Sequence, residues 1–239
     1  MPSPSVPAPA AASAPSVAPQ AKAAPVVVDV WHDTVCPWCR IGIANIEAAS
    51  KRSGIAIELR LHPFLLDPST PPEGRDLRAW LAQKYGGQQV AGMFDRVTAI
   101  GAHAGVHFDF AKVTRGPQTL ASHVAIAAAP PALRDAFVHA VHVAYFEQGQ
   151  DIGDVEVLAR LADQVGWSAA EARDAANDRT RRDEVAAAAR LASARGISGV
   201  PFVVIAGRSL HGAQPVETFA AALAAATPAP SEAGLAPAR

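Results

Sequence analysis

Thiols are scarce in this sequence, which contains two cysteines, Cys36 and Cys39, among 239 residues. Because the two lie three positions apart, a disulfide between them would close a loop too short to brace a fold. A small scaffold held together by disulfides is therefore excluded. Any cysteine chemistry must take place at this one position in the chain.

Charge and long apolar runs are also scarce. Charged residues make up 18% of the sequence and the formal net charge is −1, which argues against a nucleic-acid partner or an anionic membrane surface. No apolar run reaches the roughly 18 residues that a bilayer span needs. Half of the residues are hydrophobic, enough for a sizeable core, and the length suits one elaborated domain or two small ones.

The two ends of the chain have a biased composition. Residues 1–25 consist almost entirely of Ala, Pro, Ser and Val, and such a segment cannot bury enough surface to offset the entropy of ordering. We expect a disordered tail there and a second one at 227–239. A secretory signal is the alternative for the first segment, but it lacks a basic start and prolines interrupt it. The expected location is therefore cytoplasmic.

Two predicted strands flank a predicted helix in the first quarter of the chain. The segment Val26–Trp31 is β-branched and aromatic, as in a buried strand. A helix is predicted over Pro37–Lys51, because proline suits the first helical turn. Residues 55–62 alternate at period two, which predicts a second strand. From about residue 75 to residue 195 apolar residues recur at helical spacing.

The period changes back near the C-terminus. The predicted elements there are a strand at 201–206, a turn at Gly207-Arg208, a return strand at 209–211 and a helix at 215–225. The full order is β-α-β, a long helical block, then β-β-α. This order predicts an α/β fold in which a sheet domain (26–62 and 197–226) is interrupted by a helical insertion (63–196).

The sequence Cys36-Pro37-Trp38-Cys39 lies at the predicted junction of a strand and a helix. This placement suits thiol chemistry, because a thiolate is the nucleophile and a helix N-terminus stabilises it. Cys36 is then the attacking thiol, and Cys39, one turn later, resolves the mixed disulfide. Pro37 and Trp38 would tune the redox poise of the pair. No cofactor is expected besides the disulfide itself.

A zinc half-site is the alternative interpretation of the two cysteines. Zinc requires four ligands, and there is no second cysteine pair, although His32 and His62 could contribute. We therefore expect no metal. His32 and Asp33 end the first strand just ahead of the thiols, where they either tune Cys36 or cap the strand.

A second constellation, Gly199-Val200-Pro201, opens the third predicted strand. A proline at the start of a strand is awkward for pairing because it donates no hydrogen bond. One interpretation is an edge-strand proline, and the other is a cis-proline loop beside the thiols. Spacing alone does not choose between them.

Several segments carry a family resemblance. They are V-D-V-W-H-D-T-V-C-P-W-C-R-I-G, L-H-P-F-L-L-D-P, Y-F-E-Q-G-Q-D-I-G-D-V-E-V-L-A-R-L-A, A-R-G-I-S-G-V-P-F-V-V-I and H-G-A-Q-P-V-E-T-F. Together they resemble the DsbA-like thioredoxin-fold family, in the FrnE-like branch that is related to 2-hydroxychromene-2-carboxylate isomerases. The resemblance covers about residues 26–225. It implies a thioredoxin fold with a large all-helical insertion.

The resemblance also implies roles for individual residues. Cys36 would be the nucleophile, Cys39 the resolving thiol and Pro201 a cis-proline facing them. Val200 would be the main-chain docking residue, where substrate backbone pairs as an extra strand. Some members carry a further cysteine pair near the C-terminal end, whereas this chain has none, so a relay through a second disulfide is excluded.

The activity expected from these features is thiol–disulfide exchange with protein thiols or disulfides or with a small thiol, glutathione being a possible co-substrate. The insertion would roof the site and form much of the substrate surface. One alternative is a glutathione-dependent isomerase or transferase of the hydroxychromene carboxylate type, whose relatives typically lack the second cysteine. Another is a redox-responsive binding protein or holdase. The oligomeric state is not predicted.

The other histidines are expected to be structural. His139 and His142 are spaced i, i+3 and His103 and His107 i, i+4, but neither pair has a carboxylate at ligand spacing. We expect no catalytic role for His123.

Overall fold

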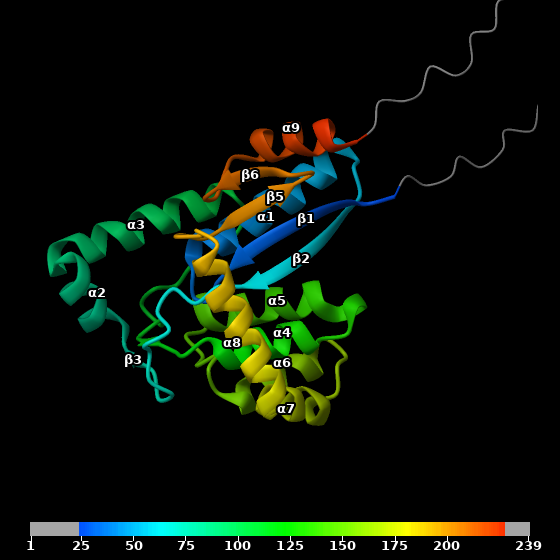
Figure 1. The fold of residues 1–239 in the computed structure, drawn as a ribbon. Helices are drawn as coiled ribbons and strands as arrows, with labels where there is room; N and C mark the ends of the chain where they lie inside the picture. Colours follow the sequence, from blue (N-terminus) through cyan, green and yellow to red (C-terminus); the bar gives the residue numbers. More distant parts are fainter. Residues whose placement is uncertain (1–23, 228–239) are drawn as a thin grey trace, which may run out of the picture.

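The structure of the protein is a computed structural model that describes residues 24–227. Its elements follow the predicted order (Figure 1). They are β1 (Val26–His32), α1 (Pro37–Ser53), β2 (Ile57–Pro63), β3 (Arg75–Asp76), α2 (Leu77–Tyr85), α3 (Gly87–His103), β4 (Arg115–Gly116), α4 (Leu120–Ala128), α5 (Pro131–Phe146), α6 (Val155–Gln164), α7 (Ala169–Asn177), α8 (Arg179–Ala194), β5 (Phe202–Ile205), β6 (Arg208–His211) and α9 (Val216–Ala226). The tails predicted at 1–25 and 227–239 lie, apart from their inner ends, outside the described residues.

Strands from both ends of the described chain, β1 and β2 before the helical block and β5 and β6 after it, form one four-stranded sheet. Its strand order is β2-β1-β5-β6. β1 pairs with β2 in parallel and with β5 antiparallel, so Val28 lies between Leu59 and Ile205. The segments before and after the helical block therefore meet at the centre of the sheet. This confirms the predicted α/β fold with an interrupted sheet, while the domain boundaries themselves stay a prediction.

One face of the sheet is buried under α1 and α9, which lie side by side and contact each other (Figure 1). Every second residue of β1 and β5 points into this core, as the period of a strand requires. The fully buried members include Val28, Val30, Val203, Ile46, Phe219 and Leu223.

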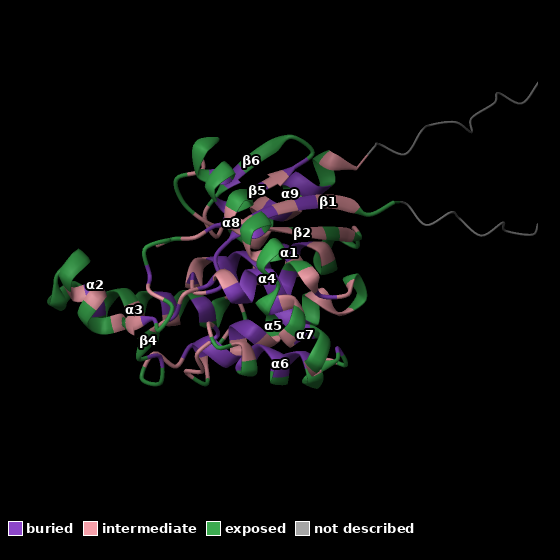
Figure 2. Cartoon of the chain, turned by 60° about the horizontal axis from the view of Figure 1, so that its bottom comes forward, coloured by how far each residue is buried: buried purple, intermediate pink, exposed green. Residues whose placement is uncertain are grey.

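The helices between β2 and β5 enclose a second core, centred on Phe137, Phe146 and Leu158. Ile41 of α1 belongs to this second core and Ile46 to the first, so α1 is packed on both sides. α4 is largely buried and α5 buries one side, whereas α2 and α3 project from the body and are more exposed (Figures 1 and 2). None of the helices within residues 24–227 is long and apolar enough to cross a lipid bilayer.

Two details differ from the prediction. The insertion is not entirely helical, because β3 and β4 form a two-residue antiparallel pair, too short to leave a pattern in the sequence. The β5–β6 turn was predicted at Gly207-Arg208, and this was wrong by one position. The turn residues are Ala206 and Gly207, with φ of 47° and 80°, and Arg208 already pairs in β6. Alanine rarely adopts a positive φ, so it gives no turn signal.

Candidate active site

The two cysteines lie where β1 leads into α1. Pro37 is the first residue of α1, and Cys36 is its N-cap with an extended backbone, φ −86° and ψ 111°. The Cys36 carbonyl accepts hydrogen bonds from the amides of Cys39 at 3.1 Å and Arg40 at 3.3 Å, which close the first turn. Cys36 is therefore at the positive end of the helix dipole, and Cys39 lies one turn further along.

The two thiols are free and differ in their access to substrate. Cys36 is 3% exposed and lines a cleft, and its Sγ donates to the Val200 carbonyl at 3.6 Å. Cys39 is fully buried. Burial, together with the neighbouring Cys36, raises the pKa of the Cys39 thiol well above its ordinary value, and a hydrogen bond with the Asp33 backbone opposes this. One thiol on a cleft and one enclosed is the arrangement that a nucleophile and a resolving thiol need.

The loop that enters β5 lies against the turn Cys36-Pro37-Trp38-Cys39, which is called the redox turn below. The Val200–Pro201 peptide bond is cis, which is the geometry that the resemblance implies. A Cβ at Gly42 of α1 would lie 3.0 Å from Pro201 Cγ, so the missing side chain lets the loop approach the helix. Within residues 24–227 the Val200 amide donates no hydrogen bond. It is thus open to an incoming backbone, although the docking role of Val200 stays a prediction.

A cleft of about 340 Å³ opens beside Cys36, a size typical of small-molecule sites. One wall is the redox turn, including Pro37 and Trp38, with Val200 beside it. The rest of the lining comes mostly from the insertion and is mainly apolar. Its apolar side chains include Leu66, Leu77, Trp80, Leu81, Tyr85, Met93, Phe94, Val97, Phe110, Tyr145 and Phe146.

Charged groups on the insertion side of this cleft are few. Arg75 pairs with Asp67 at 2.9 Å, and the ammonium of Lys84 lies 4.8 Å from the centre of the Trp80 ring. Leu66 is 43% exposed at the same wall. The cleft is therefore mainly apolar, and the charged residues that line it are Asp33, Asp67, Arg75 and Lys84.

A buried polar cluster lies behind the cysteines, and the sequence pointed to His32 and Asp33 but not to their histidine neighbours on the insertion. Its members are His32, Asp33, His123 of α4 and His142 of α5, each 1–3% exposed. The His32 ring centre is 5.0 Å from that of His123 and 6.5 Å from that of His142. Asp33 Oδ2 accepts a hydrogen bond from the Leu66 amide at 2.8 Å, and its Oδ1 lies 3.4 Å from His123 Nε2. Asp33 therefore contacts the insertion rather than capping its own strand.

Two of these three histidines are held neutral. Burial lowers the pKa of His32 well below its ordinary value, and the other histidines add to the effect. Burial, assisted by the charge of Arg40, lowers the pKa of His142 to about 3. His139, which the sequence pairs with His142, is exposed on the same helix. The two histidines that are spaced i, i+3 therefore differ in burial: the His142 ring is enclosed and the His139 ring is exposed to solvent.

The residue after the second cysteine, Arg40, is 4% exposed. Its Nη1 donates to the His107 carbonyl at 2.6 Å, and its Nη2 pairs with Glu147. The guanidinium carbon lies 5.2 Å from the ring centre of Phe108 and 5.8 Å from that of Phe146. Arg40 therefore fastens α1 to the insertion directly beside the redox turn.

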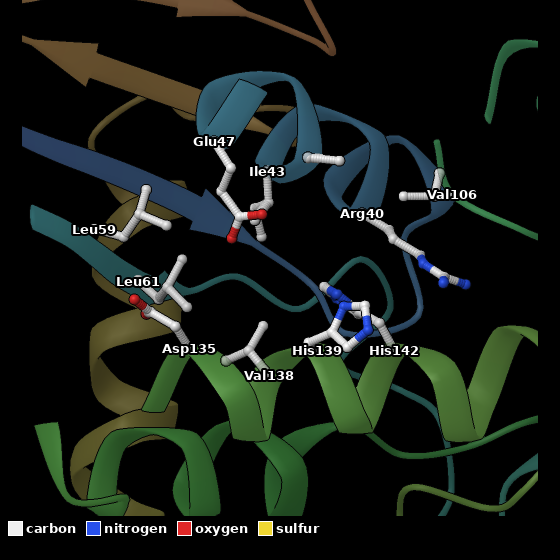
Figure 3. A pocket seen from close by; sticks show the side chains of 11 residues that line it. Arg40, Ile43, Glu47, Leu59, Leu61, Val106, Asp135, Val138, His139 and His142 are labelled. Carbon is white, nitrogen blue, oxygen red and sulfur yellow. The ribbon is translucent and has the colours of Figure 1, made fainter. Parts of the chain in front are cut away.

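A smaller pocket of about 40 Å³ lies between α1 and α5. Figure 3 shows Arg40 and Glu47 projecting into it from α1, and Asp135, His139 and His142 from α5. Burial raises the pKa of Glu47 there. The volume suits a few water molecules rather than a substrate. Within residues 24–227, no group of three or more His, Cys, Asp or Glu side chains is arranged to hold a metal ion.

Comparison with known proteins gives a consistent result. The DSBA-like thioredoxin domain model matches residues 27–224. The uncharacterized protein YwbO of Bacillus subtilis (strain 168) is 29% identical over 200 residues, which are 83% of this chain and 96% of YwbO. A crystal structure of the probable DsbA oxidoreductase SCO1869 from Streptomyces coelicolor has a TM-score of 0.74 and 30% identity, covering 84% of this chain and 89% of that one.

A more distant structure has the same fold. The cytosolic disulfide reductase DsbM from Pseudomonas aeruginosa, with GSH, has a TM-score of 0.59 and 20% identity, covering 84% of this chain and 98% of that one. At this identity the likeness is one of fold alone. The match of the family model over most of the chain goes further and confirms the resemblance noted in the sequence: the chain belongs to the DSBA-like thioredoxin domain family.

Proposed function

We propose that the protein is a thiol–disulfide oxidoreductase in which Cys36 is the nucleophile and Cys39 the resolving thiol. The observation that carries the proposal is the position of Cys36, at the N-cap of α1 and on the wall of the cleft. In the reducing direction the Cys36 thiolate attacks one sulfur of a substrate disulfide and releases the other as a thiol. Cys39 then attacks Cys36, closes the disulfide and releases the second thiol.

The substrate proposed is a protein thiol or disulfide, or a small thiol such as glutathione. The apolar cleft of about 340 Å³ supports either kind of substrate, and the open amide of Val200 supports backbone pairing with a peptide. The presence of GSH in the DsbM structure supports the small thiol. Because DsbM is named a cytosolic reductase, we propose a cytoplasmic location as well.

Substitution of each cysteine tests the assignment. Cys36→Ser is expected to abolish both insulin reduction and dithiol oxidation. Cys39→Ser is expected to keep the first step and to accumulate the mixed disulfide at Cys36, visible as a mass increase of the intact protein. Ser53→Ala, at the exposed end of the same helix, is the control and keeps the parent rate. An unchanged rate in Cys36→Ser would refute the assignment.

The direction of electron flow follows from the equilibrium potential of the Cys36–Cys39 pair in a glutathione buffer. A value near the cytosolic poise supports a reductase or isomerase, and a much more positive value an oxidase. Turnover of a hydroxychromene carboxylate with glutathione that survives Cys39→Ser would favour the isomerase alternative instead. Equal suppression of aggregation by the double cysteine-to-serine variant would favour the holdase.

A further inference from the structure

The reactive thiol is enclosed rather than presented on an open surface. Cys36 lines the cleft but is only 3% exposed. Residues of the insertion and Val200 line the same cleft, so a disulfide that reacts with Cys36 must bring its sulfur atoms inside. A folded protein with a surface disulfide is far larger than this cleft of about 340 Å³, whereas the volume is typical of small-molecule sites. The enclosure favours a small substrate.

Aromatic rings make up much of the insertion's part of the lining. They belong to Trp80 and Tyr85 of α2, Phe94 of α3, Phe110, and Tyr145 and Phe146 of α5. The rings of Phe94 and Phe110 are stacked, with centres 4.4 Å apart and an angle of 16° between the planes. Offset and edge-to-face ring pairs add to the free energy that is gained from burial alone. The lining therefore favours an aromatic group over an aliphatic group of the same size.

Further contacts hold the stacked pair in place. Phe110 also stacks on Phe108, with ring centres 5.4 Å apart and an angle of 1°. Phe108 is 4% exposed, and the guanidinium carbon of Arg40 lies 5.2 Å from its ring centre. The guanidinium carbon of Arg78 in α2 lies 5.2 Å from the Phe94 ring centre, and its Nη2 donates to the Phe110 carbonyl at 2.9 Å. A surface that is ordered before the ligand arrives loses less entropy on binding.

The charges that line the cleft cancel one another. Two are acidic, Asp33 and Asp67, and two are basic, Arg75 and Lys84. Arg75 pairs with Asp67 at 2.9 Å, and the ammonium of Lys84 lies 4.8 Å from the centre of the Trp80 ring. The formal charges of the lining residues sum to zero, so charge complementarity favours a neutral group.

We propose that Cys36 exchanges with a low-molecular-weight disulfide that carries a neutral aromatic group, and that Trp80, Phe94 and Phe110 bind this group. These three residues determine specificity, because they contact the substrate but take no part in the exchange of bonds. The inference rests on the proposed oxidoreductase function and commits it to one kind of substrate.

The two thiols of the protein supply the electrons, so the reaction balances without a further reagent. The Cys36 thiolate attacks one substrate sulfur, the substrate disulfide bond breaks, and the other sulfur leaves as a thiolate that takes up a proton. The mixed disulfide at Cys36 keeps the second aromatic group in the cleft. Cys39 then loses its proton, attacks Cys36 and releases the second thiol. Both substrate sulfurs are reduced, and the two cysteines are oxidised to a disulfide.

Three symmetrical disulfides separate aromatic binding from size and from intrinsic reactivity. They are the disulfides of benzyl mercaptan, cyclohexylmethanethiol and 2-mercaptoethanol. Each is mixed with the reduced protein, and chromatography of the thiol released before an acid quench gives a second-order rate constant. This constant is divided by the constant for dithiothreitol with the same disulfide. The normalised constant should be about 10- to 100-fold larger for the benzyl than for the hydroxyethyl disulfide, the range expected for burying a phenyl group. The cyclohexylmethyl disulfide should lie between them.

Phe94→Leu and Trp80→Leu test the rings, because leucine keeps an apolar side chain without one. Each is expected to lower the ratio of the benzyl to the cyclohexylmethyl constant by about 3-fold, since one ring pair is lost. Ile100→Leu is the matched control, because Ile100 lies on the same helix as Phe94, is 37% exposed and is not part of the cleft lining. It should keep the parent ratio. Far-UV circular dichroism shows that each variant is folded, and the comparison of disulfides in the parent protein needs no variant.

Three results would overturn the proposal. They are equal normalised constants for the three disulfides in the parent protein, a normalised constant for insulin as large as that for the benzyl disulfide, and a parent ratio in both folded leucine variants of the cleft. If the reduced protein releases no thiol from any of these disulfides, insulin included, the oxidoreductase function itself is refuted. Failure of the function and failure of the substrate assignment are therefore distinguishable.

Discussion

Replacement of Arg40 with alanine tests how strongly the insertion holds the redox helix. The change removes a donor to the His107 carbonyl and the partner of Glu147. It also removes the cation that lies over two aromatic rings. Because Arg40 is 4% exposed, the groups left behind gain little water.

The expected loss is about 3 kcal/mol of unfolding free energy. Removing one partner of a buried ion pair costs about 3–5 kcal/mol, because the other charge is stranded. Glu147 is 27% exposed, so water solvates it in part and the lower end of that range applies. For a folded unit of this size, the same loss lowers Tm by about 6–12 °C.

Urea unfolding of parent and variant measures the loss. Arg52→Ala on the same helix is the control, because Arg52 and its partner Glu217 are 57% and 68% exposed, and such surface pairs contribute about 0–1 kcal/mol. The double variant Arg40→Ala/Glu147→Ala is expected to lose less than the sum of the two single losses, since no charge is then stranded. If Arg40→Ala costs no more than Arg52→Ala, the ion pair does not anchor the helix.

Two further predictions concern pH and backbone space. The folded-state pKa of His142 is about 3 against 6.5 ordinarily, so the unfolded chain binds more protons between these values. The unfolding free energy, measured in urea at a series of pH values, should therefore fall as pH drops from about 6.5 to about 3. His142→Asn should make this fall shallower and the exposed His139→Asn should not; parallel curves for parent and His142→Asn would contradict the assignment. Gly149→Ala should lower Tm more than Gly54→Ala, which costs about 1–2 kcal/mol because alanine disfavours the left-handed backbone conformation. Both glycines have a positive φ, but a Cβ at Gly149 would lie 2.2 Å from the Lys112 carbonyl oxygen, whereas Gly54 faces open space; equal losses would refute this.

The elements that carry the redox turn could be predicted from the sequence because their signals are local. A β-branched run followed by Pro37 indicates a strand and then a helix, and the structure places Cys36 at that junction. The cis geometry at Pro201 could not be chosen from spacing and followed only from the family resemblance. Its place beside the thiols depends on β5 pairing with β1, a contact between distant segments that no local pattern encodes.

The polar surroundings of the thiols were missed for a related reason. His123 lies in an apolar, Ala-rich helix, where a lone histidine gives no catalytic signal. Its position beside Asp33 is set by how α4 packs against the end of β1. Arg40 follows Cys39 directly in the sequence, yet its partner Glu147 is 107 residues away. Hydrophobic periodicity predicts which face of a helix is buried, but it does not predict which polar group of another element a buried side chain contacts.

The insertion therefore also contacts the turn that carries the two cysteines. Three polar groups on either side of the cysteines each find a partner on the insertion. The pairs are Asp33 with the Leu66 amide, Thr34 with Ser122, and Arg40 with Glu147. Without the insertion, a buried carboxylate, hydroxyl and guanidinium would lose their partners within eight positions of the chain, and each unmet group costs about 1–3 kcal/mol or more. The sheet segments alone thus lack the partners that these three groups have on the insertion.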